Sequence, residues 1–204
     1  MKILSLVDGS KATSFLAFML AVAAFVLCGC ASTASNGNDQ IVKAAIELAE
    51  EYRSLGRLED SIGVYDKALE RTYDYRLLYN KALTIANLGD FEQAAALCQE
   101  GHGSFPYILA FKKAQAKYYI ELERWQDAAS SYIEVLELDP YDTSTRKELI
   151  SLYSTNGESE KVVEQATILW SQGYRTAEIL GFMKTSYPSV ASSSDSLADF
   201  SKED

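Results

Sequence analysis

Few side chains in this sequence are of a type that could carry out covalent or acid–base chemistry. Histidine occurs once, as His102, and cysteine three times, as Cys28, Cys30 and Cys98. A catalytic nucleophile needs an adjacent base and a third group that orients that base, and no serine here lies in a GxSxG turn. We expect His102 to be a partly buried structural imidazole and Cys98 a small buried apolar side chain. No catalytic residue is predicted, and the protein is predicted not to be an enzyme.

Neighbouring carboxylates are the remaining candidates, at Glu50-Glu51, at Glu59-Asp60, and at Glu158 with Glu160. A general acid and a general base need surroundings that separate their pKa values, and no apolar or cationic neighbour in the sequence would do so. We interpret these carboxylates as solvated helix faces. The sequence also lacks the CxxC, HExxH, phosphate-loop and dinucleotide-binding patterns. Neither a metal site nor a cofactor is predicted.

The N-terminal segment differs in character from the rest of the chain. Lys2 and Lys11 precede an uncharged run of 14 residues, 14–27, and the small residues 28–30 follow it. The run is too short to cross a bilayer as a helix, which takes about 20 apolar residues. A charged start, an apolar middle and small residues at the end are typical of an export signal.

The end of this segment, Leu27-Cys28-Gly29-Cys30, resembles the lipobox of bacterial lipoproteins. The resemblance implies that residues 1–29 are a signal peptide, that Cys30 becomes the lipidated first residue, and that residues 30–41 form a flexible tether. Stable anchoring takes two lipid signals, which a diacylglyceryl group and an amide-linked chain supply. The alternatives are an ordinary secretory signal cut near residues 31–34 and an uncleaved anchor.

Localisation and cysteine pairing follow from the same resemblance. Ala31 stands after the modified cysteine, where some enterobacterial lipoproteins have the Asp that retains them at the inner membrane. We therefore expect a lipid-anchored protein of the bacterial cell envelope, with the outer membrane favoured and its face unassigned. Cys28 would leave with the signal and Cys30 would carry lipid, so Cys98 has no partner for an internal disulfide.

The overall charge restricts the partners. The chain carries a formal charge of −10 at pH 7. Such a surface repels nucleic acid and anionic lipid headgroups. We therefore expect no nucleic-acid partner.

An internal repeat organises residues 42–174. The pairs Leu55-Gly56, Leu88-Gly89, Leu122-Glu123 and Asn156-Gly157 recur at spacings of 33, 34 and 34 residues. Each unit consists of two amphipathic helical patterns separated by a short turn. A fixed period of this length indicates stacked pairs of helices.

These units resemble tetratricopeptide repeats. Small residues stand where the two helices of a repeat cross, at Ala49, Ala82 and Ala116 on first helices and at Ser61, Ala94 and Ala128 on second helices. Pro106 and Pro140 close the second and third repeats, where proline ends a helix. The resemblance implies an all-α, right-handed solenoid of stacked helix-turn-helix repeats. The predicted boundaries are repeats at 42–74, 75–108, 109–142 and 143–174, a capping helix at 175–187 and a disordered tail at 188–204.

Three further features of the sequence carry expectations. Glu123 replaces the usual turn glycine, which requires a helical or strained backbone at that residue. The capping helix covers the last repeat, and the rival interpretation is a helix lent to another copy of the chain, giving a homo-oligomer. The chaperone-type carboxylate clamp is not expected, because other residues stand at its positions and only Asn80 matches. Those other residues are Ile46, Glu50, Ala110 and Ala114.

The predicted binding surface is the concave face of the solenoid. In the family it is lined by the second, fifth, ninth, twelfth and thirteenth residues of each first helix, where this sequence has six basic and two acidic residues. This excess of positive charge predicts a groove for an acidic segment, and an ordinary solvated helix face is the alternative. The predicted partner-binding residues are Lys43, Ile46, Arg53, Arg76, Tyr79, Leu83, Asn87, Lys113, Lys117, Ile120 and Lys147.

Together these features predict a membrane-anchored protein-interaction scaffold that holds a protein or peptide in this groove. The rival function is an accessory component of an envelope transport system, in which the groove, or a channel between copies, holds a small apolar solute. That function needs a continuous apolar lining. The sequence offers only Ile46, Leu83 and Ile120 there.

Overall fold

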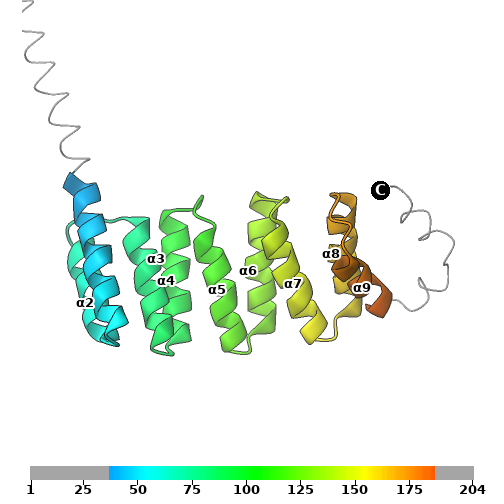
Figure 1. The fold of residues 1–204 in the computed structure, drawn as a ribbon, viewed down its shortest axis with the longest axis horizontal. Helices are drawn as coiled ribbons and strands as arrows, with labels where there is room; N and C mark the ends of the chain where they lie inside the picture. Colours follow the sequence, from blue (N-terminus) through cyan, green and yellow to red (C-terminus); the bar gives the residue numbers. More distant parts are fainter. Residues whose placement is uncertain (1–36, 187–204) are drawn as a thin grey trace, which may run out of the picture.

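The computed structural model describes residues 37–186, and helices joined by short turns make up this part of the chain (Figure 1). The signal segment, Cys30 and the tail 188–204 lie outside the described residues, so the predictions about them stay predictions. No helix within the described range is long and apolar enough to cross a bilayer. The helices are residues 37–54, α2 Leu58–Leu69, α3 Tyr75–Asn87, α4 Phe91–Ser104, α5 Ala110–Glu121, α6 Trp125–Leu138, α7 Thr143–Thr155, α8 Ser159–Ser171 and α9 Ala177–Ser186.

Successive helices run antiparallel, and the repeats follow one another along the long axis of the described part of the chain (Figure 1). The tight turns inside the repeats therefore all lie along one edge, which we call the turn edge. The connections between repeats, residues 70–74, 105–109, 139–142 and 172–176, lie along the opposite edge, which we call the loop edge. The first helix also begins at the loop edge, so residue 37 lies on the same side as these connections.

The first helix is longer than the sequence analysis predicted. It already includes residue 37, so residues 37–41 are helical and do not belong to the predicted flexible tether. Part of the reason is Asp39, whose carboxylate bonds Lys43 one turn later at 2.9 Å and Arg76 of α3 at 2.8 Å. Neither contact could be inferred from a hydrophobic pattern, because both are polar.

The turns follow the predicted glycine pattern. Gly56, Gly89 and Gly157 have φ angles of 73°, 86° and 72°, in the left-handed region that favours glycine. Glu123 takes the same conformation, with φ 56°. The expected strain at this glutamate is therefore present, because a side chain in this region costs roughly 1–2 kcal/mol.

Small residues allow the helices of a repeat to pack closely. Ala82 of α3 and Ala94 of α4 are completely buried, as are Ala116 of α5 and Ala128 of α6. In the fourth repeat Ile150 and Val162 take these places and are buried as well. The repeats stack through large core side chains such as Tyr132. These observations confirm the all-α solenoid.

Helix α9 closes the C-terminal end of the stack. Ile179 is completely buried in the same cluster as Ile150, Val162 and Leu169, and Phe182 packs against that cluster. The helix thus covers the apolar end of the last repeat within its own chain, as a capping helix does.

A close helix contact at Gly101 of α4 leads to the first testable prediction. A Cβ atom there would overlap the ring of Phe111, which is completely buried in α5. We expect Gly101→Ala to lower the free energy of unfolding by about 1–3 kcal/mol, because the ring has no space to move into.

Gly103→Ala is the matched control for this substitution, because nothing lies within 4 Å of a Cβ at that position of the same helix. Alanine has the better helix propensity, so this variant should be stabilised by up to about 1 kcal/mol. Urea unfolding followed by circular dichroism measures both values. Equal effects of the two substitutions would contradict the packing described here.

Candidate functional site

The candidate site is the face formed by the first helices of the repeats, namely residues 37–54, α3, α5 and α7. None of the predicted partner-binding residues is buried, so a partner can reach all of them. The exposed ones are Lys43, Asn87, Lys117 and Lys147, and the half-buried ones are Ile46, Arg53, Arg76, Tyr79, Leu83, Lys113 and Ile120. We call this surface the first-helix face.

The basic residues of the first two repeats are paired with carboxylates. Lys43 lies 2.9 Å from Asp39, and Arg53 lies 3.4 Å from Glu50. Arg76 contacts two carboxylates, Asp39 at 2.8 Å and Asp74 at 2.9 Å.

The basic residues of the third and fourth repeats have carboxylate partners too. Lys113 forms an ion pair with Asp142. Lys117 lies 3.5 Å from Glu148, and Lys147 lies 3.6 Å from Glu178 of α9.

The net positive charge predicted for this face is therefore not retained. Each of its six basic side chains has a carboxylate within 4 Å, and most of these carboxylates were counted outside the groove. Sequence reasoning missed Asp39 because it fell in the predicted tether. It missed Asp142, Glu148 and Glu178 because each of them lies at or in a different helix from its basic partner. The pattern of residues within one helix does not show which side chains of a neighbouring helix lie opposite.

Several of these contacts join one first helix to the next, or α7 to α9, and we call this series the inter-repeat ladder. Asp39–Arg76 joins the first helix to α3, Lys117–Glu148 joins α5 to α7, and Lys147–Glu178 joins α7 to α9. Between α3 and α5 the contact is aromatic: the rings of Tyr79 and Phe111 meet edge to face with centroids 5.7 Å apart. The face is therefore both a surface and a set of contacts between repeats.

Asp142, the partner of Lys113, is also the N-cap residue of α7. Its carboxylate accepts hydrogen bonds from the backbone N–H of Thr145 at 3.1 Å and from the hydroxyls of Ser144 and Thr145 at 2.7 and 2.8 Å. Burial alone would raise the pKa of Asp142, but Lys113 and these donors outweigh it and hold the pKa well below its usual range. Asp74 has a lowered pKa for a related reason, the hydrogen bonds from Arg76.

The chemically reactive side chains are not brought together. Cys98 is completely buried, and burial raises the pKa of its thiol to about 12, so the sulfur stays protonated at neutral pH. The pKa of His102 is lowered, first by burial and then by the charge of Lys112. Within residues 37–186 no three potential metal-binding side chains lie close enough to hold a metal ion.

A hollow that sequence reasoning did not identify lies among α2, α3 and α4. Its volume is about 420 Å³. Lys81 and Asp66 form an ion pair of 2.6 Å in its wall, so its lining is partly charged. The other lining residues are Ile62, Ile85, Gln93, Ala96, Leu97 and Glu100.

Comparison with known proteins supports the assignment of the fold. Residues 46–107 match the family described as tetratricopeptide repeat. A solved structure of MamA (41-end) from Desulfovibrio magneticus RS-1 is 16% identical, covers 80% of this chain and 98% of its own, and gives a TM-score of 0.58. A tetratricopeptide repeat protein from Parabacteroides merdae is 19% identical, with 79% of this chain and 63% of that chain covered and a TM-score of 0.57.

A third similar structure is the first TPR domain of Spaghetti (RPAP3) bound to the HSP90 peptide SRMEEVD. It is 21% identical, covers 58% of this chain and 94% of its own, and gives a TM-score of 0.51. Identities this low show a shared fold and no more. The described part of the chain is thus a helical-repeat protein, and its fold is the tetratricopeptide-repeat solenoid.

The environment of Asp142 leads to the second prediction. Asp142→Ala should lower the free energy of unfolding by about 2 kcal/mol, because it removes a helix cap and the partner of Lys113. Asp90→Ala is the matched control, since Asp90 caps α4 through one hydrogen bond from Gln93 at 3.0 Å. It should cost about 1 kcal/mol. Urea titration of both variants measures the difference.

The same site has a defined pH dependence. A carboxyl group whose pKa is lower in the folded state stabilises the fold above its unfolded pKa, and that contribution is lost as the pH falls through the folded value. For Asp142 the ordinary value is 3.8. The stability gap between wild type and Asp142→Ala should therefore be constant above about pH 5 and shrink below about pH 4. A gap that widens in acid would contradict this assignment.

Proposed function

We propose that this protein is a membrane-anchored interaction scaffold of the bacterial cell envelope, which holds a protein or peptide segment against its first-helix face. The observation that carries the proposal is the composition of that face. Half-buried apolar groups, among them Tyr79, Leu83 and Ile120, alternate with accessible charged groups along successive repeats. Such a surface suits an extended or helical segment of another chain.

A peptide occupant is consistent with a protein of the same fold. The TPR domain of Spaghetti (RPAP3) is bound to the HSP90 peptide SRMEEVD, a segment with more acidic than basic residues. The clamp residues of the chaperone type are not expected in this chain, so another mode of recognition must operate. We infer a segment whose carboxylates meet lysines in the C-terminal half of the face.

Lys117 and Lys147 are the best placed of the basic residues for this role. Their side chains are 59% and 43% exposed, and their carboxylate partners, at 3.5 and 3.6 Å, are exposed as well. Exposed ion pairs of this kind contribute only about 0–1 kcal/mol. A partner's carboxylate can therefore replace Glu148 or Glu178 at little cost, whereas Arg76 and Lys113 are held by more buried carboxylates.

The anchoring part of the proposal rests on the lipobox-like segment that ends at Cys30, with the outer membrane favoured. The rival function is an accessory component of an envelope transport system that holds a small apolar solute, and nothing among the described residues favours it. The apolar side chains of the first-helix face are separated by ion pairs, and the hollow among α2, α3 and α4 has a partly charged wall.

Charge reversal tests the site. Lys117→Glu with Lys147→Glu should reduce capture of the native partner from crosslinked cells and weaken its binding about tenfold or more, because like charges then face the acidic segment. The matched control reverses Lys67 and Lys161, which lie on second helices. Mass spectrometry identifies the partner, and titration at low and physiological salt gives the affinity. Unchanged binding by the first-helix variant, or binding insensitive to salt, would contradict the proposal.

Lipidation is tested separately. Cys30→Ala should leave an uncleaved or mislocalised precursor, because the acylated sulfur is removed. Intact-mass measurement of the wild-type protein from membranes should show acyl groups on a chain that begins at Cys30. A mature protein that starts downstream of this residue without lipid would rule out the anchor.

A further inference from the structure

A row of tyrosines runs along the loop edge. Tyr73, Tyr107, Tyr141 and Tyr174 recur at spacings of 34, 34 and 33 residues, one in each connection between repeats. Their exposed fractions are 52%, 90%, 76% and 44%. We call this surface the tyrosine edge.

The fold does not need these rings at the centre of the row. Tyr107 and Tyr141 are mostly exposed, so their rings contribute little to the core. Exposed apolar side chains accompany them: Leu138 is 59% exposed, and Pro106 and Pro140, which directly precede Tyr107 and Tyr141, are exposed as well. Grouped exposed apolar side chains mark an interaction surface more often than single ones do.

The connections hold the tyrosines in place. Tyr73 stacks on Phe105 with ring centroids 5.7 Å apart, and its hydroxyl donates to Glu100 at 3.0 Å. The turn that carries Tyr141 is held at the carbonyl oxygen of Pro140, which accepts from Arg146 at 2.9 Å and from Gln172 at 3.0 Å. A surface that is ordered before binding loses less conformational entropy when it binds.

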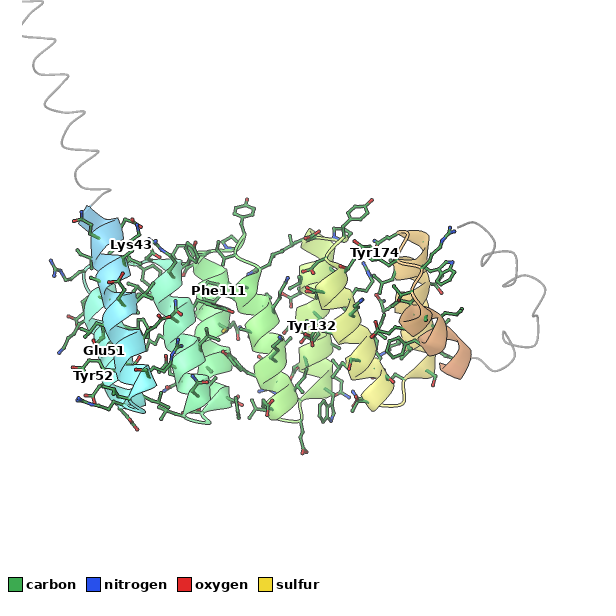
Figure 2. All side chains as sticks on the ribbon, in the orientation of Figure 1. Lys43, Glu51, Tyr52, Phe111, Tyr132 and Tyr174 are labelled. Carbon is green, nitrogen blue, oxygen red and sulfur yellow. The ribbon has the colours of Figure 1, made fainter. Side chains whose placement is uncertain are left out.

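The point where the chain enters the solenoid indicates what covers this edge. Residue 37 lies at the loop edge (Figure 1), and Figure 2 places Lys43 of the first helix and Tyr174 toward that edge, with Glu51 and Tyr52 at the other. Cys30 is seven residues before residue 37. Seven residues span at most roughly 25 Å. Because the helix already includes residue 37, a lipid on Cys30 keeps the N-terminal end of the loop edge within this distance of the bilayer.

Tyrosine is chemically suited to that position. Its ring is apolar and its hydroxyl is polar, so it is enriched where hydrocarbon meets water at membrane surfaces. The exposed charges beside the row are mixed: Arg71 and Arg175 accompany Glu70, Glu137 and Asp139. Zwitterionic headgroups therefore suit the edge better than anionic ones.

We propose that the tyrosine edge rests on the headgroup region of the membrane that holds the lipid anchor. This inference rests on the proposed anchoring at Cys30. The helices then stand upright on the bilayer, with the turn edge pointing away from it. The first-helix face is perpendicular to the membrane and stays open to a partner from the side.

Nitroxide labels on the full lipidated chain test this orientation in phosphatidylcholine vesicles. Single variants Tyr107→Cys and Tyr141→Cys place labels on the tyrosine edge, and Leu55→Cys and Leu88→Cys place matched labels on the turn edge. Cys98 is completely buried and should not react with the label. We expect reconstitution to lower the accessibility of the two tyrosine-edge labels to a water-soluble nickel complex severalfold and to raise their accessibility to oxygen. The turn-edge labels should not change.

A second variant shows whether the tyrosines cause the contact. A label at Leu138→Cys should be shielded in the presence of all four tyrosines and should return to water when Tyr107→Ser and Tyr141→Ser are added. Flotation of the same vesicles reports anchoring independently. If the protein floats with the vesicles but its tyrosine-edge labels are as accessible to the nickel complex as its turn-edge labels, the inference is overturned and the proposed anchor is not affected.

Two other outcomes would also overturn the inference. A chain that does not float overturns the proposed anchor and this inference with it. Shielding of the tyrosine-edge labels in the absence of vesicles, increasing with protein concentration, would mean that a second copy covers the edge and would overturn the inference.

Discussion

The close crossing of the two helices within each repeat is the constraint on which the rest of this structure depends. Ala82 and Ala94 belong to one core cluster and Ala116 and Ala128 to another, and none of the four has any exposed surface. One pair of helices cannot bury its own apolar faces, so such pairs are stable only when they stack. Larger side chains such as Tyr65 and Tyr132 then fill the space between crossings. Where the stack ends, Ile179 of α9 replaces the missing neighbour.

Stacking also decides the electrostatics of the first-helix face. Neighbouring first helices lie side by side, so a lysine on one helix meets a carboxylate on the next, as Lys117 meets Glu148. A row of basic residues along single helices thus becomes a ladder of ion pairs across the solenoid. An acidic partner binds such a face when its carboxylates replace the protein's own carboxylates as partners of the basic side chains. It depends on how exposed each existing pair is, which distinguishes Lys117 and Lys147 from Lys113.

The two edges of the solenoid differ in chemistry because they are made by different kinds of connection. The turn edge consists of tight turns that each contain one residue in the left-handed region, a glycine in three of them and Glu123 in the fourth. The loop edge consists of longer connections with room for proline and for an outward tyrosine in each repeat. The first helix begins at the loop edge. The proposed anchor and the row of tyrosines can therefore both face the membrane in one orientation of the molecule, and the first-helix face stays open in that orientation.

Much of the fold could be predicted from the sequence, because its determinants repeat every 33 or 34 residues and act over short distances. The small residues at the crossings, the turn glycines, the strain at Glu123, the burial of Cys98 and the capping helix all belong to this class. The structure alone revealed the carboxylates opposite the basic residues, the early start of the first helix at Asp39, and the common edge shared by residue 37 and the tyrosines. These features depend on the angle and spacing at which one repeat packs on the next. The periodicity within a single helix contains no information about that packing.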